Sequence, residues 1–167
     1  IAAGDARVHG VLASFCRARL IDNLERFSPL FAGLDATAVR RALSGFAARK
    51  LAPGDVAVEQ GRLAPALFIV LEGALAVSMV TGTERALLRT LGAGDVFGEM
   101  SMLSEEGASA SVTATVPSMV LVLPRVAFGE LVLGLPTLRV RLELLAEQRR
   151  LQNDALLPDA SSSATLI

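Results

Sequence analysis

The chain has 167 residues, of which 52% are hydrophobic, and a formal net charge of -1, so it is long enough for one domain with an ample core. The near-neutral charge, together with the absence of any apolar run near the ~20 residues of a membrane helix, excludes nucleic acid and membrane as expected partners. One cysteine, Cys16, and one histidine, His9, exclude an internal disulfide and disfavour a zinc or His-based catalytic site, and we expect a cytoplasmic protein.

Residues 1–27 are predicted to form a helix, because Val8, Leu12 and Phe15 recur at helical spacing. We favour a helix that packs on the domain, and the alternatives are the end of an upstream helical region or a helix that relays a binding signal. Pro29 ends this helix, and Asp35 is a suitable N-cap for a second one that reaches about Ala48.

Between Arg49 and Leu123 the sequence changes to short apolar stretches separated by glycine turns. The segment 51–56 (LAPGDV) recurs almost unchanged as 91–96 (LGAGDV), which indicates two equivalent corners where a strand enters a turn. We predict a buried strand over 66–71 that pairs as a hairpin with 74–80, followed by a turn at Gly82. Such closely spaced short strands predict a mainly β fold, a sandwich or jelly roll.

Two helices are predicted after the strands, over 125–133 and from Pro136 to about Gln152. The second carries two apolar lines, which exceeds what docking on one surface requires. The lines are Leu138, Leu142 and Leu145, and Val140, Leu144 and Leu151. We weigh equally a lid that also forms a homodimer and a helix that only packs on the barrel. The remaining residues, 152–167, are predicted to be a disordered tail, too short for a DNA-reading domain.

The segment 92–114 has a pattern suited to an anion. Gly92 and Gly94 allow a tight turn that Asp95 can brace through backbone amides. Gly98 permits a second turn, and 99–103 then fits one or two turns of helix, whose first N–H groups are free. A polar loop and an alternating strand follow. We therefore predict a small phosphate cradle built from a glycine turn, one helical turn and a loop.

This segment resembles the phosphate-binding cassette of cyclic-nucleotide-binding domains, such as those of catabolite activator protein and protein kinase A regulatory subunits. Residues 97–102 (FGEMSM) match the family pattern F-G-E-x-[AS]-L, and 109–111 (SAS) match its end without an insertion. The resemblance covers roughly residues 28–151 and implies a β-jelly roll flanked by N-terminal and C-terminal α-helices. It also implies that Glu99 binds the ribose 2′-hydroxyl of cAMP or cGMP, with no separate cofactor. The predicted ligand-binding residues are Phe97, Gly98, Glu99, Met100, Ser101, Ala108, Ser109 and Ala110.

One position departs from the family pattern, because Gly107 and Ala108 stand where the family has Pro-Arg. In the family that arginine holds the cyclic phosphate. Losing one side of a buried charge pair costs about 2–5 kcal/mol, whereas a helix N-terminus contributes only about 0.3–2 kcal/mol toward an anion. We therefore expect weak nucleotide binding unless another residue, such as Arg89 or Arg62, replaces the arginine.

Two functions follow from the sequence, and neither is enzymatic. The first is a regulatory module that senses cAMP or cGMP weakly and relays binding through its C-terminal helices. The second is a degenerate domain of the same fold that binds no nucleotide and serves as an interaction or assembly module for an upstream or partner protein domain. The acidic pair Glu105 and Glu106 favours the second function, and the retained Glu99 favours the first.

Overall fold

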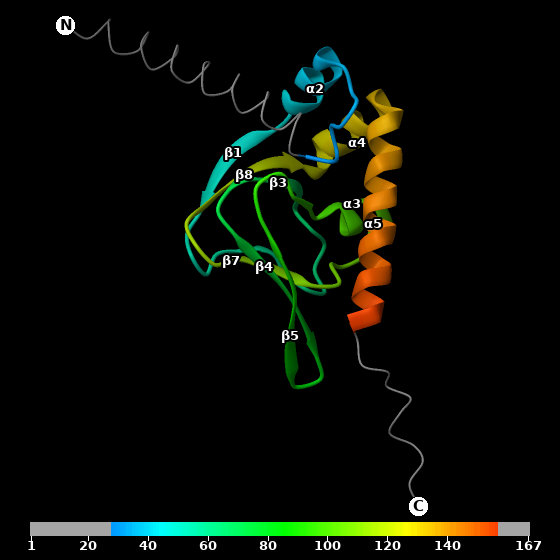
Figure 1. Ribbon diagram of the computed structural model, residues 1–167. Helices are drawn as coiled ribbons and strands as arrows, with labels where there is room; N and C mark the ends of the chain where they lie inside the picture. The colour runs from blue at the N-terminus through cyan, green and yellow to red at the C-terminus, as the bar shows by residue number, and fades with distance from the viewer. Residues whose placement is uncertain (1–27, 157–167) are drawn as a thin grey trace, which may run out of the picture.

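The computed structural model describes residues 28–156, which form two four-stranded antiparallel sheets with helices along one side (Figure 1). One sheet has the strand order β1-β8-β3-β6 and the other β2-β7-β4-β5. This arrangement confirms the predicted mainly β jelly roll with flanking helices, while the helix predicted over 1–27 lies outside the described residues. The elements are α2 (Ala36–Leu43), β1 (Ala47–Leu51), β2 (Val56–Val58), β3 (Ala66–Glu72), β4 (Leu75–Thr81), β5 (Glu84–Leu91), β6 (Val96–Phe97), α3 (Glu99–Ser104), β7 (Ser111–Ala114), β8 (Ser118–Pro124), α4 (Arg125–Gly134) and α5 (Pro136–Leu156).

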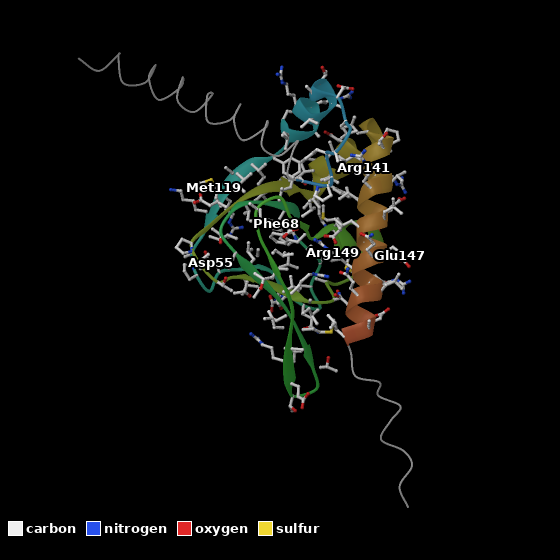
Figure 2. All side chains as sticks on the ribbon, in the orientation of Figure 1. Asp55, Phe68, Met119, Arg141, Glu147 and Arg149 are labelled. Carbon is white, nitrogen blue, oxygen red and sulfur yellow. The ribbon has the colours of Figure 1, made fainter. Side chains whose placement is uncertain are left out.

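Strand β3 lies between two apolar cores, which explains its uninterrupted apolar sequence. Phe68, labelled in Figure 2, and Val70 point into the core between the sheets. There Phe68 stacks on Phe97 with ring centroids 4.7 Å apart. Leu67 and Ile69 point the other way, into a core shared with α2, α4 and α5. Because successive side chains of a strand face opposite sides, a strand covered on both faces needs apolar residues at every position.

The two repeated corners have the same geometry, as the sequence predicts. Gly54 and Gly94 have φ of 91° and 90°, a left-handed conformation that suits glycine. Asp55 accepts a hydrogen bond from the Ala52 N–H at 2.9 Å, and Asp95 accepts the corresponding bond from the Gly92 N–H at 2.8 Å. The second corner delivers β6 directly to the start of α3.

Two local predictions are wrong. Strand β4 does not pair with β3, because β3 pairs with β6 and β8 whereas β4 pairs with β5 and β7. Between them Gly73 has φ of 100°, and a Cβ atom there would lie 2.2 Å from Ser118 Oγ, so glycine is required where the chain passes from one sheet to the other. Helix α2 ends at Leu43 rather than near Ala48, because Ala47 already pairs with β8. Its predicted N-cap is confirmed by the 2.8 Å bond from the Ala38 N–H to Asp35.

Helix α5 crosses the open side of the barrel and passes beside α3 (Figure 1). It continues to Leu156, about one turn beyond the predicted end, so residues 152–156 are helical rather than part of a tail. The two apolar lines separate as the periodicity predicts. Leu138 and Leu142 are buried in the core. In contrast Val140, Leu144 and Leu151 are exposed, with Leu144 at 63%.

Candidate functional site

All eight residues predicted to bind a ligand line one cavity between the barrel and α5. The cavity has about 430 Å³ of empty space, part of it open to solvent. Its barrel wall is apolar, formed by Val58, Val77, Leu91 and Val112. Arg89 from β5 and Arg149 and Asn153 from α5 complete the lining with polar groups. The site therefore combines an apolar wall, a polar cassette and a helix that covers both.

The turn into α3 requires glycine at position 98. Gly98 has φ of 86°, and a Cβ atom there would lie 2.5 Å from the Ala66 carbonyl oxygen. Any side chain would therefore push the cassette away from β3. Immediately after this turn, Glu99 begins α3 with its side chain directed inward, and it is only 1% exposed.

The loop after α3 is held by hydrogen bonds to the segment between β2 and β3. The Ala108 N–H donates to the Arg62 carbonyl, and the Gly61 N–H donates to the Ala108 carbonyl, each at 2.8 Å. The Ser101 hydroxyl accepts from the Ala64 N–H at 2.9 Å and donates to the Glu106 carbonyl. In this structure Ser101 and the Ala108 backbone hold the loop in place, and the Ala108 methyl group adds no charge to the cavity.

Glu99 forms a buried ion pair with Arg149 of α5. The Arg149 Nη1 atom donates to Glu99 Oε1 at 2.8 Å, and the same guanidinium donates to the Val96 carbonyl. Figure 2 shows Arg149 on the barrel side of α5 and Glu147 on its outer side. Because the side-chain bonds to this carboxylate from residues 28–156 use only Oε1, its second oxygen is left to accept a hydrogen bond from a ligand. The pair joins the cassette directly to the C-terminal helix.

Arg89 also lines the cavity and bonds to the last turns of α5. Its Nη1 atom donates to Gln152 Oε1 at 3.1 Å and its Nη2 atom to Asn153 Oδ1 at 3.2 Å. Asn153 in turn donates to the Ser109 hydroxyl at 3.4 Å. Burial lowers the pKa of Arg89, and the neighbouring Arg149 charge lowers it further, while Glu99 and Asp95 act in the opposite direction. The charged form of Arg89 is thus incompletely compensated in its surroundings.

The sequence reasoning missed two residues of this site, Arg149 and Asn153. In sequence, Arg149 is one of several charges that cover α5, and Asn153 falls within the predicted tail. Their separation by one helical turn, on the side that carries Leu138 and Leu142, is the signal that both face the barrel. Of the two arginines considered as replacements, Arg89 lines the cavity, whereas the Arg62 side chain is 77% exposed and pairs with Glu59.

The part of the chain that the structure describes spans residues 28–156. Within that range no group of three or more His, Cys, Asp or Glu side chains is placed to hold a metal ion. None of the helices that the structure describes is both long enough and apolar enough to cross a bilayer.

The family model named "Cyclic nucleotide-binding domain" matches residues 48–133, slightly more than half of the chain. A cyclic AMP receptor protein of Thermus thermophilus is 37% identical over 129 residues, which are 76% of this chain and 59% of that protein. A cGMP-dependent protein kinase of Caenorhabditis elegans is 36% identical over 89 residues, which are 52% of this chain and 11% of the kinase.

The solved structures include the catabolite activator protein of Thermus thermophilus, which superimposes with a TM-score of 0.70 at 36% identity. The superposition covers 77% of this chain and 61% of that one. This chain therefore spans about three fifths of the bacterial relative and a small part of the kinase. With the cavity, the buried Glu99 and the match over 48–133 in agreement, the chain belongs to the cyclic nucleotide-binding domain family.

Proposed function

We propose that this chain is a regulatory module that binds a cyclic mononucleotide weakly and transmits binding to α5. The observation that carries the proposal is the convergence of all eight predicted residues on one cavity that α5 covers. The apolar wall suits a base, and Glu99, held 1% exposed, has an oxygen available for a ribose hydroxyl. The two relatives described above are named for cyclic nucleotides, one for cAMP and one for cGMP, which supports the ligand class without choosing between them.

The buried pair provides a route by which binding would reach α5. A ligand hydroxyl that donates a hydrogen bond to Glu99 would compete with Arg149 for this carboxylate and weaken the ion pair. Arg149 lies on α5, so the effect would reach that helix. Ligand binding would then shift α5 between two arrangements as a change in their populations. The exposed line of Val140, Leu144 and Leu151 is the surface through which such a shift would act on a second copy or on another protein.

The alternative is a domain of this fold that binds no nucleotide and acts in assembly. It is favoured by Ala108, which leaves the cassette without an arginine, and by the neighbouring Glu105 and Glu106. In this case the ion pair between Glu99 and Arg149 is a permanent fastening of α5 to the barrel.

Calorimetric titration with cAMP and with cGMP separates the two functions. For the sensor we expect a Kd of about 10⁻⁵ M or weaker for the better ligand, because no arginine is present on the cassette. Absence of heat and of thermal stabilisation with either nucleotide would favour the assembly function.

The variant Ala108→Arg tests the assigned pocket directly. Because Ala108 lines the cavity, a guanidinium there is expected to tighten cyclic nucleotide binding by about tenfold or more. Ala86→Arg is the matched control, since residue 86 is exposed on β5 and the variant adds the same charge outside the cavity. Equal effects of the two variants would refute the pocket, and loss of affinity in Glu99→Gln tests the ribose contact.

A further inference from the structure

Arg89 is a cavity arginine whose bonds all go to neutral groups. Its two donors reach the amide oxygens of Gln152 and Asn153, and its Nε atom is buried without a partner among residues 28–156. No carboxylate in that range lies within ion-pair distance of it. A guanidinium has five donors in a fixed fork, and its preferred partners are carboxylate and phosphate oxygens.

The cavity lining also carries excess positive charge. Its charged residues are Arg89, Arg149 and Glu99, so two positive charges face one negative charge and the lining has a net charge of +1. Glu99 is already paired with Arg149 at 2.8 Å, which leaves Arg89 as the uncompensated member. In a partly water-excluded cavity, this imbalance favours an anion over a neutral ligand.

Asn153 joins Arg89 to the cassette through a single side chain. Its carbonyl oxygen accepts from Arg89 at 3.2 Å, and its amide nitrogen donates to the Ser109 hydroxyl at 3.4 Å. Arg89 and Ser109 are therefore bridged by the single amide group of Asn153, and both line the cavity. An anion oxygen in that place would accept from the guanidinium and from the Ser109 hydroxyl together, whereas the amide satisfies Arg89 only as a neutral acceptor.

We propose that Arg89 of β5 holds the anionic group of the ligand in place of a cassette arginine, and that the anion displaces the side chain of Asn153. The ligand is a small phosphate-bearing anion, and its identification as a cyclic nucleotide rests on the proposed function above. Displacement of Asn153 removes a bond from the last turns of α5 to β5 and another to the cassette. Binding at Arg89 is thereby coupled to the end of α5.

The test compares Arg89→Gln with Arg62→Gln, which removes the same charge from an exposed position, in calorimetry with cAMP and cGMP. We expect Arg89→Gln to weaken binding by roughly tenfold to a hundredfold and Arg62→Gln to leave it within about twofold. Adding Ala108→Arg to Arg89→Gln should restore affinity, because it returns a guanidinium to the cassette side. Equal affinity of Arg89→Gln and the unaltered chain would overturn the proposal.

Asn153→Ala gives an independent reading. If the anion displaces this side chain, the variant binds more tightly than the unaltered chain, although its thermal midpoint without ligand is lower. Weaker binding would show that Asn153 is itself a ligand contact and would overturn the displacement. Circular dichroism confirms folding, and Arg89→Lys serves if Arg89→Gln does not fold.

Pyrophosphate separates failure of this inference from failure of the proposed function. If neither cyclic nucleotide binds, the sensor function fails, but Arg89 should still make pyrophosphate raise the thermal midpoint of the unaltered chain and not of Arg89→Gln. If pyrophosphate stabilises both chains equally, or stabilises neither, Arg89 is not an anion-binding residue. If adenosine or guanosine binds as tightly as its cyclic nucleotide, the site does not select an anion.

Discussion

The ion pair between Glu99 and Arg149 offers the sharpest test of how α5 is attached. Arg149→Met keeps most of the side-chain volume but leaves Glu99, which is 1% exposed, without its charged partner. Breaking a buried pair costs about 3–5 kcal/mol. We expect a value near the lower end, about 3 kcal/mol, because the Arg89 charge lies close enough to Glu99 to offset part of the loss. For a domain of this size the thermal midpoint should fall by roughly 10 °C.

The measurement is thermal and urea unfolding followed by circular dichroism, since the chain has no Trp or Tyr for fluorescence. The adjacent Arg150→Met is the matched control, because Arg150 pairs with Glu147 on the solvent side and both side chains are more than half exposed. Its midpoint should remain essentially unchanged. A double-mutant cycle with Glu99→Gln should yield a coupling energy of about 2 kcal/mol. If Arg149→Met and Arg150→Met shift the midpoint equally, the buried pair does not fasten α5.

Two further substitutions test the cassette turn and the two faces of α5 by the same unfolding measurement. Gly98→Ala should cost about 2 kcal/mol or more, since its Cβ would lie 2.5 Å from a β3 carbonyl oxygen, and Gly82→Ala, at φ of 63° with open space around it, should cost only about 1 kcal/mol. Similar losses in the two variants would contradict the close approach at Gly98. Leu138→Ala should cost about 3 kcal/mol because the side chain is fully buried, whereas Leu144→Ala, 63% exposed, should change the free energy of unfolding by less than about 0.5 kcal/mol. A large loss from Leu144→Ala at high protein concentration would instead indicate that this face is covered by a second copy.

Local chemistry explains why much of the fold could be predicted from the sequence. The Gly-Asp corners depend on short-range contacts. Each has a glycine at positive φ and an aspartate that accepts a hydrogen bond from the N–H group three residues earlier. The cap at Asp35 and the glycine turn at position 98 are local in the same sense. The cassette pattern spans 14 consecutive residues, 97–110, so its spacing survives in the folded chain as one wall of a cavity.

The errors arose where partners lie far apart in the chain. An apolar run such as 66–71 does not indicate which strand pairs with it, and β3 pairs with β6 and β8, both distant in the sequence, rather than with the adjacent β4. The composition of the last residues predicts a tail from residue 152, but Asn153 is buried and bonds to Ser109, which is 44 residues earlier.

The sequence by itself determined the jelly roll, its repeated corners and the eight residues of 97–110 that line the cavity. These features depend on spacing within short segments. Only the tertiary structure decided what faces the eight residues: it brings Arg149 to Glu99 across 50 residues and Arg89 to Asn153 across 64. The charge of the cavity is set by these long-range contacts, since an arginine on a strand or helix surface has no local signal for the side chain that it will meet after folding.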